Sequence, residues 1–200
     1  MSIAIRDVGE HDLDTVLALN NSAGQAILPL DADRVRFFMR LAEYFRVAEV
    51  DGQVAGFLIA LRPGTPYGSS NYRWFCERYS DFLYIDRIVV AGSRRGSGLG
   101  KVFYADVTSY AEVRVPILAC EVFLEPRNDA ALIFHGTYGF REVGQHRMEE
   151  AGRQVSLLVK DLPSFEYVQT TYLAHGGLPD VDWLQSRLQP QDARARATGT

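Results

Sequence analysis

The pattern of hydrophobic and polar positions predicts strands and helices that follow one another along the chain. Ile3 and Ile5 alternate with other residues, as in a half-buried strand. Apolar residues at helical spacing predict a helix from Leu13, and a second helix capped by Asp31 or Asp33 should follow it. The chain therefore opens with one strand and two helices.

Two further segments come next. The runs Phe45–Val50 and Val54–Leu61 flank Asp51-Gly52, a dipeptide typical of tight turns between antiparallel strands. In Arg62–Arg78, prolines, glycines and serines surround a group of aromatic residues, which predicts a long loop. We therefore expect a hairpin followed by an irregular segment.

The second half predicts the centre of the fold. A buried strand at Phe82–Val90 runs into a glycine-rich turn and a helix at 99–113. A strand at 117–124, a helix at 128–137 and two strands at 141–149 and 154–159 follow. These elements predict one α/β domain over residues 1–162, with a mixed central sheet flanked by helices. Residues 163–200 are expected to form an extension with a helix over 173–188 and a disordered tail.

Composition excludes several classes of protein. Of the 200 residues, 47% are hydrophobic, 12% aromatic and 23% charged, which is typical of globular chains. A net charge of −4 and a pI of about 5.6 argue against binding to nucleic acid or to an anionic membrane. The longest apolar run, Val54–Leu61, is far shorter than a spanning helix, and the first residues do not resemble a signal peptide. We expect a soluble cytoplasmic protein.

The two cysteines give no sign of a disulfide framework or a zinc site. Cys76 and Cys120 are far apart and lack CxxC spacing, which favours reduced thiols. No metal is expected.

The turn after the buried strand carries the strongest chemical signal. It places Gly96, Gly98 and Gly100 at the start of a helix, beside Arg94, Arg95 and Lys101. Glycines let a ligand approach the backbone, and the helix N-terminus and the cations favour an anion. We interpret this turn as a binding loop for a pyrophosphate.

Spacing separates this loop from two better-known phosphate loops. A P-loop would need glycine at Arg95 and Ser or Thr at Val102, and a dinucleotide fingerprint would need glycine at Lys101. The pattern that fits is R-x-x-G-x-G, formed by Arg95, Gly98 and Gly100.

With a second motif downstream, the sequence resembles the GNAT superfamily of N-acetyltransferases over about residues 3–160. Asn128, Ala131, Phe134-His135 and Gly139-Phe140 stand at the offsets of that family's second motif. The resemblance implies the acetyl-CoA N-acyltransferase fold, with acetyl-CoA as acyl donor and no metal. It implies that Asn128 reaches the pantetheine arm, and that homodimers are common among such proteins. The implied cofactor-binding residues are Ile88, Val89, Val90, Arg95, Gly96, Ser97, Gly98, Leu99, Gly100, Lys101 and Asn128.

Acetyl transfer to an amine requires a base, because an alkyl ammonium titrates near ~10. Asp86 is the first candidate; strand alternation would place it on one face with Tyr84 and Ile88. Glu121, on the neighbouring strand, is the other candidate base and could instead bind a cationic substrate. A salt bridge to an arginine is the alternative role of either carboxylate.

The remaining steps involve other groups. The resemblance implies that a backbone N–H near Val89 or Val90 meets the oxyanion. The family's usual acid, a tyrosine, is replaced here by His135, which could protonate the leaving thiolate; Tyr138 is the alternative. Neither cysteine lies in an evident nucleophile context, so transfer should be direct.

Two functions are consistent with this sequence. The first is an enzyme that acetylates a small-molecule or peptide amine, with Tyr72, Trp74 and Phe75 either forming a wall for the acceptor or packing at a dimer interface. The second is a module that binds acyl-CoA without catalysis and serves as a sensor.

Overall fold

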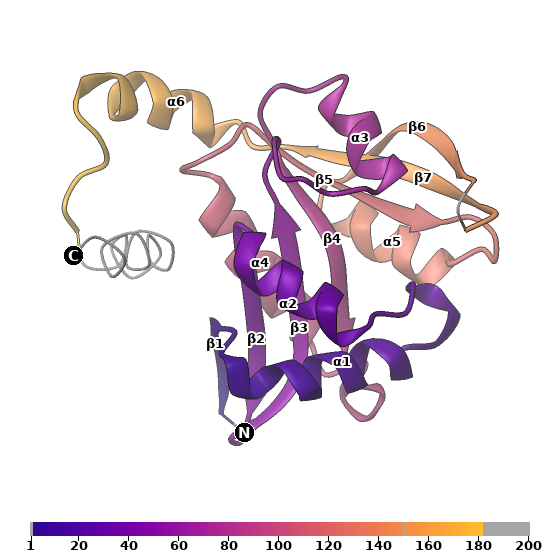
Figure 1. The fold of residues 1–200 in the computed structure, drawn as a ribbon. Coiled ribbons are helices and arrows are strands. Elements are labelled where there is room, and N and C mark those ends of the chain that lie inside the picture. Colours follow the sequence, from indigo (N-terminus) through magenta and orange to yellow (C-terminus); the bar gives the residue numbers. More distant parts are fainter. Residues whose placement is uncertain (1, 150, 182–200) are drawn as a thin grey trace.

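A seven-stranded sheet forms the centre of the computed structural model, which describes residues 2–149 and 151–181 (Figure 1). Its strand order is β1-β2-β3-β4-β5-β7-β6, and β4 and β5 pair in parallel while the other neighbours are antiparallel. This mixed sheet confirms the predicted fold class. The strands are β1 (Ile3–Asp7), β2 (Tyr44–Val50), β3 (Gln53–Leu61), β4 (Leu83–Val90), β5 (Ile117–Phe123), β6 (Arg141–Met148) and β7 (Arg153–Asp161).

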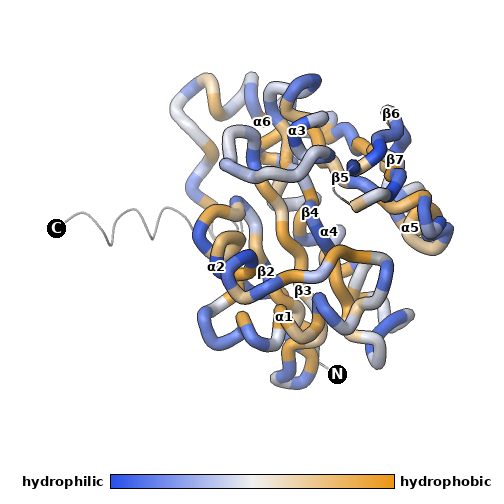
Figure 2. The backbone as a smooth tube through the Cα atoms, turned by 45° about the vertical axis from the view of Figure 1, so that its right-hand side comes forward, coloured by the Kyte–Doolittle hydropathy of each residue, from blue (hydrophilic) through white to orange (hydrophobic). Residues whose placement is uncertain are grey.

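Helices cover both faces of the sheet. Helices α1, α2 and α3 lie on one face and α4 and α5 on the other (Figure 1). Val16, Phe38 and Phe75 pack in the core layer of the first face, whereas Phe103 and Tyr104 of α4 pack in the other layer with residues of α5. Hydrophobic residues follow the central strands, and hydrophilic ones are concentrated on the outer helices and turns (Figure 2). The helices are α1 (Leu13–Ser22), α2 (Ala32–Leu41), α3 (Ser70–Cys76), α4 (Leu99–Ala111), α5 (Asp129–Thr137) and α6 (Ser164–Thr171).

Two local signals in the sequence are confirmed. Oδ1 of Asp31 accepts a 2.7 Å hydrogen bond from the backbone N–H of Arg34 and so caps α2. Asp51 and Gly52 have φ values of 49° and 80°, as a tight hairpin turn between β2 and β3 requires.

The expected loop at 62–78 is wrong in part, because it contains α3. Ser69 caps this helix by accepting a hydrogen bond from the Tyr72 N–H at 3.3 Å. Tyr72 and Phe75, three positions apart, face the core and are 3% and 0% exposed. Burial of these two rings outweighs the flanking prolines and glycines.

The two parallel strands pair over a short distance. Residues 83–85 of β4 pair with residues 118–120 of β5, and the last of these pairs is Ile85 with Cys120. Beyond it no pairing joins the two strands, although β4 continues to Val90 and β5 to Phe123. The sheet therefore opens at its centre.

A β-bulge in β4 lies where this opening begins. Ile59 of β3 pairs with Arg87 and Ala60 pairs with Ile85, so Asp86 is the extra residue. The bulge reverses the alternation of side chains: Tyr84 packs in the layer of α1 to α3, and Ile88 packs in the layer of α4 and α5. The prediction that Tyr84, Asp86 and Ile88 share one face is therefore wrong.

The chain leaves the sheet after β7. Helix α6 projects from it and is followed by a 3-10 turn at Leu173–His175 (Figure 1). Gly176 and Gly177, with φ values of 115° and 108°, interrupt the helix expected over 173–188. Residues 182–188 of that expected helix and the expected tail lie outside the described residues. Within the described part of the chain, no helix has the length and apolar character needed to cross a membrane.

Candidate active site

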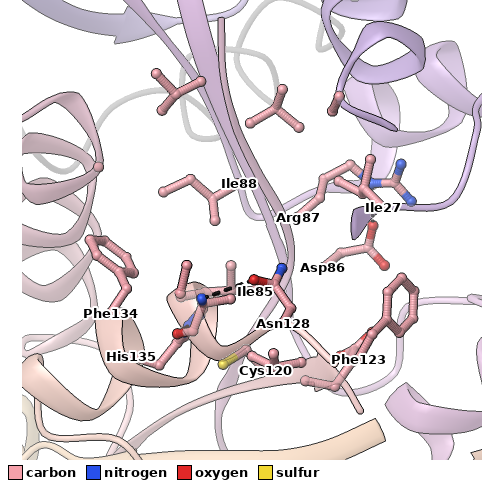
Figure 3. A pocket seen from close by; sticks show the side chains of 18 of the residues that line it. Ile27, Ile85, Asp86, Arg87, Ile88, Cys120, Phe123, Asn128, Phe134 and His135 are labelled. Atoms are coloured by element: carbon pink, nitrogen blue, oxygen red, sulfur yellow. Dashed lines mark hydrogen bonds and ion pairs between the residues drawn. The ribbon is translucent and has the colours of Figure 1, made fainter. Parts of the chain in front are cut away.

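A cavity of about 1020 Å³ lies where β4 and β5 separate. Its walls include β4 from Ile85 onward, the β4–α4 turn, residues 120–123 of β5 and part of α5. Asp86 and Arg87 lie on one side of the cavity, and Phe134 and His135 lie on the other (Figure 3). The cavity is therefore open to both faces of the sheet.

The β4–α4 turn has the geometry of an anion site. Gly96 and Gly98 have φ values of 77° and 89°, which L side chains rarely adopt. Gly98 is the N-cap of α4 and has no side chain to satisfy the first N–H groups of the helix. Gly98 lines the cavity, and a Cβ added to it would meet no atom within 4 Å. These free donors and the space above them fit the pyrophosphate of acetyl-CoA.

All of the expected cofactor-binding residues line this cavity. They are Ile88, Val89, Val90, Arg95, Gly96, Ser97, Gly98, Leu99, Gly100, Lys101 and Asn128. Asn128 caps α5 through a 3.1 Å hydrogen bond from the Ala131 N–H to Oδ1.

Gly100 has a packing role as well. A Cβ there would lie 3.1 Å from the ring of Phe134, which is tighter than an ordinary van der Waals contact. A side chain at position 100 would therefore require the Phe134 ring of α5 to shift by a few tenths of an ångström.

The exposed edge of β4 offers two backbone donors. The N–H of Ala91 bonds to the carbonyl of Ala55 in the strand next to β4, and backbone groups alternate in direction along a strand. The N–H of Val89 therefore points toward β3, and those of Ile88 and Val90 point toward the opening.

Glu121 projects from β5 toward the layer of α1 to α3. Its Oε2 accepts a 2.6 Å hydrogen bond from the hydroxyl of Tyr84. Burial, and then the negative charge of Asp86, raise the pKa of Glu121 to about 8, although the contacts of Tyr84 and Asn71 favour the ionised form. A carboxylate with this pKa can take up a proton near neutral pH.

Both carboxylate oxygens of Asp86 already have partners within the protein. Its Oδ2 lies 2.6 Å from Nε of Arg87, and its Oδ1 accepts a hydrogen bond from the hydroxyl of Tyr67. Arg87 is in turn held by Oδ1 of Asn20 at 2.8 Å. The Asp86 and Arg87 side chains are 4% and 7% exposed, so this is a buried ion pair. Of the two candidate bases, Glu121 is the one without an arginine partner among the described residues.

His135 lines the cavity on the side of α4 and α5. Its Nδ1 lies 2.7 Å from the carbonyl oxygen of Ala131. A carbonyl can only accept, so Nδ1 carries the proton and Nε2 of the neutral ring has none to give. Burial lowers the pKa of His135 below its usual 6.5, which favours the neutral ring. Tyr138 packs against Tyr104 and Phe134 instead of lining the cavity.

The expected acceptor wall of Tyr72, Trp74 and Phe75 is wrong, because α3 turns these side chains elsewhere. The Tyr72 hydroxyl donates to the carbonyl of Arg62 at 2.7 Å, and Phe75 is in the core. Trp74 fits against Gly144 of β6, where a Cβ would come within 3.1 Å of its ring. These residues dock α3 on the sheet.

Several cavity residues were not expected. Ile27, Leu28 and Arg34 come from the α1–α2 connection and α2, Tyr67 from the segment before α3, and Met148 from β6. Arg34 occupies an exposed helix position that carries no sequence signal, whereas Tyr67 belonged to the aromatic group at 62–78.

The two thiols differ in their surroundings. Cys120 lines the cavity, and burial raises its pKa well above the usual value, so this thiol stays protonated. Cys76 is exposed, and both cysteines are free. Among residues 2–149 and 151–181, no group of three or more His, Cys, Asp or Glu is placed to hold a metal ion.

The structure is thus a mixed α/β sheet that opens at its centre beside a glycine-rich turn suited to an anion. The chain belongs to the acetyltransferase (GNAT) family, whose model matches residues 13–140. No curated protein sequence matches the chain significantly.

Solved structures share this fold. Ard1 from Thermoplasma volcanium aligns with a TM-score of 0.66 at 18% identity, over 81% of this chain and 99% of its own. Ribosomal-protein-alanine N-acetyltransferase from Brucella melitensis gives 0.60 at 24% identity, over 80% and 99%. Arabidopsis thaliana Naa50 in complex with the bisubstrate analogue CoA-Ac-MVNAL gives 0.62 at 16% identity, over 80% and 99%.

Proposed function

We propose that this protein transfers the acetyl group of acetyl-CoA directly to the nitrogen of an amine, with Glu121 as general base. The observation that carries the proposal is the position of Glu121, a carboxylate with a pKa of about 8 in the opening between β4 and β5. The anion-binding turn lies on the same cavity, so one ligand can reach both.

The two substrates would reach the opening from opposite faces of the sheet. Acetyl-CoA supplies an activated acetyl group through the cavity that α4 and α5 line. Glu121 and Asp86 lie toward the layer of α1 to α3, where the amine would enter. Glu121 removes one proton from the ammonium group, and the nitrogen forms a bond to the acetyl carbon. The carbon–sulfur bond breaks with its electron pair remaining on sulfur, and the second proton lost by the nitrogen passes to the departing thiolate or to water.

Backbone groups of β4 stabilise the charge that develops on the acetyl oxygen. The N–H groups of Ile88 and Val90 point into the opening and have no strand partner there. Donors fixed in a sheet need no reorganisation during the reaction.

The thiolate leaves without a proton from His135. A thiol has a pKa near ~8.5, so its anion is a tolerable leaving group near neutral pH. His135 forms part of the wall beside it. Cys120 holds its proton and is a poor nucleophile, which supports direct transfer over a covalent enzyme intermediate.

The first experiment measures thermal unfolding with and without acetyl-CoA. A ligand at ~100 times its Kd adds roughly 2.7 kcal/mol, or about 5–10 °C for a chain of this size. Gly98→Asp should abolish the rise, because it adds bulk and negative charge at the turn. Gly152→Asp is the matched control: Gly152 also has positive φ, 60°, but lies in the β6–β7 turn away from the cavity.

A second measurement follows release of the CoA thiol with a panel of amines. Release that depends on an amine supports the enzyme. Stabilisation by acetyl-CoA without release from any amine would identify a binding module, and absence of both would refute the proposal.

A further inference from the structure

The charges that line the cavity are unequal. Five of its residues are Arg or Lys and two are Asp or Glu, in a chain with a net charge of −4. The cavity therefore concentrates positive charge, and an anionic ligand would balance it.

Four of the five cations have an evident counterpart. Arg87 pairs with Asp86, and Arg94, Arg95 and Lys101 surround the turn that suits a pyrophosphate. Arg34 is the remaining one. No carboxylate lies within 4.0 Å of its guanidinium in the described part of the chain.

Arg34 is an exposed residue of α2 that lines the cavity and lies against two aromatic rings on the side where the amine would enter. Its guanidinium carbon lies 5.4 Å from the centre of the Phe37 ring and 5.6 Å from that of Tyr67. The hydroxyl of Tyr67 in turn bonds to Asp86, whose charge reaches Glu121. One tyrosine therefore separates Arg34 from the pair of carboxylates.

Acetyl-CoA would bring no negative charge close to Arg34. The charges of that molecule are on its phosphates, and the pantetheine arm and acetyl group are neutral. Asp86 and Val90 are separated by four residues of extended chain, about 13 Å, and the turn that suits the phosphates lies beyond Val90. The exposed guanidinium of Arg34 is therefore available to a charged group of the acceptor.

We propose that the acceptor is a small primary amine that carries a carboxylate, as a free amino acid does, and that Arg34 binds this carboxylate. The ammonium group then faces Glu121 and Asp86, and the carboxylate faces the fork of the Arg34 guanidinium, which can bind it with two hydrogen bonds. This inference rests on the proposed function and specifies its substrate.

The test compares matched acceptors. The twenty L-amino acids, β-alanine and γ-aminobutyrate are each assayed beside the corresponding amide, which keeps the amine and removes the negative charge. For at least one pair, kcat/KM should favour the carboxylate by about tenfold or more, since hydrogen bonds to charged groups are strong. The amides also represent the N-terminus of a peptide, so a general preference for amides overturns the inference.

Two variants locate the effect. Arg34→Gln should reduce the preference for the carboxylate to near one and leave stabilisation by acetyl-CoA unchanged. Arg36→Gln is the control, because Arg36 is on the same helix, lies near Asp33 at 3.4 Å and does not line the cavity. An equal loss with the acid and the amide in Arg34→Gln, or the same effect in Arg36→Gln, would contradict the proposed role.

The assay separates this inference from the proposed function. A protein that binds acetyl-CoA but neither acetylates any carboxylate of the panel nor gains stability from one in the presence of CoA refutes the inference alone. A protein that acetylates only amines without a carboxylate also refutes the inference and leaves the proposed function standing. Failure to bind acetyl-CoA refutes the proposed function.

Discussion

The hydroxyl of Tyr84 donates a 2.6 Å hydrogen bond to Oε2 of Glu121, across the first pairs that join β4 to β5. Burial raises the pKa of Tyr84 well above its usual value, so this hydroxyl keeps its proton and remains a donor. The bond fixes the carboxyl group at the edge of the opening, and the chemistry of Glu121 can be tested directly.

Glu121→Gln should lower kcat by at least about 100-fold, since general bases contribute factors of this order. In the unmodified protein Glu121 is protonated below pH 8 and becomes a base above it, so the rate should rise with pH and level off above a pKa of about 8. The variant should retain only the pH dependence of the amine itself. A pH–rate profile of both proteins checks this, and an unchanged rate in the variant would remove Glu121 as the base.

Asp86→Asn should destabilise the fold by about 3–5 kcal/mol, because it leaves the buried charge of Arg87 without its partner. It should also lower the pKa of Glu121, because the charge of Asp86 helps to raise it. Urea unfolding measures the first effect, and the midpoint of the pH–rate profile measures the second. A fall of 100-fold or more in the kcat of the folded fraction, with an unshifted midpoint of the residual activity, would favour Asp86 as the base.

His135→Gln should retain turnover within about tenfold, less than the loss expected for a general acid or base. The Nδ1 proton of His135 is directed at Ala131, and its lowered pKa keeps the ring neutral. Steady-state kinetics at saturating acetyl-CoA provide the measurement. A fall of 100-fold in kcat with unchanged KM would instead restore His135 as the proton donor.

Gly100→Ala should cost about 1–3 kcal/mol of stability through overpacking, because the new methyl group meets the Phe134 ring. Phe134→Leu in the same chain should recover part of the loss. Gly136→Ala in α5 is the control: its Cβ would meet no atom within 4 Å, so removing a helical glycine there should add up to about 1 kcal/mol. Equal effects at the two glycines would contradict the packing role of Gly100.

Much of the fold follows from local patterns. Alternation and the Asp51-Gly52 turn predict the first hairpin, and the two glycine-containing motifs predict the strand, turn and helices around the cofactor site. Helix α3 was missed, although Ser69, Tyr72 and Phe75 have the spacing of a cap and a buried face, because flanking Pro and Gly residues indicate a loop.

The acceptor side of the site was much less predictable. The bulge at Asp86 depends on pairing with β3, which the alternation within β4 does not reveal. Arg34 reaches the cavity only because α2 packs beside Tyr67, a contact between distant segments. Local patterns thus predict the motif-bearing half of the cavity, and tertiary contacts determine the other half.

The short pairing between β4 and β5 makes the central sheet two smaller sheets that share a narrow seam. Residues 83–85 and 118–120 are the seam, with β1 to β4 on one side of it and β5 to β7 on the other. The cavity is lined by residues of both halves, so a ligand bound there would contact both of them across the unpaired part of the two strands. If acetyl-CoA binds here as proposed, it would stiffen the sheet as well as react, and its release would leave the two halves joined only by the seam and by their helices.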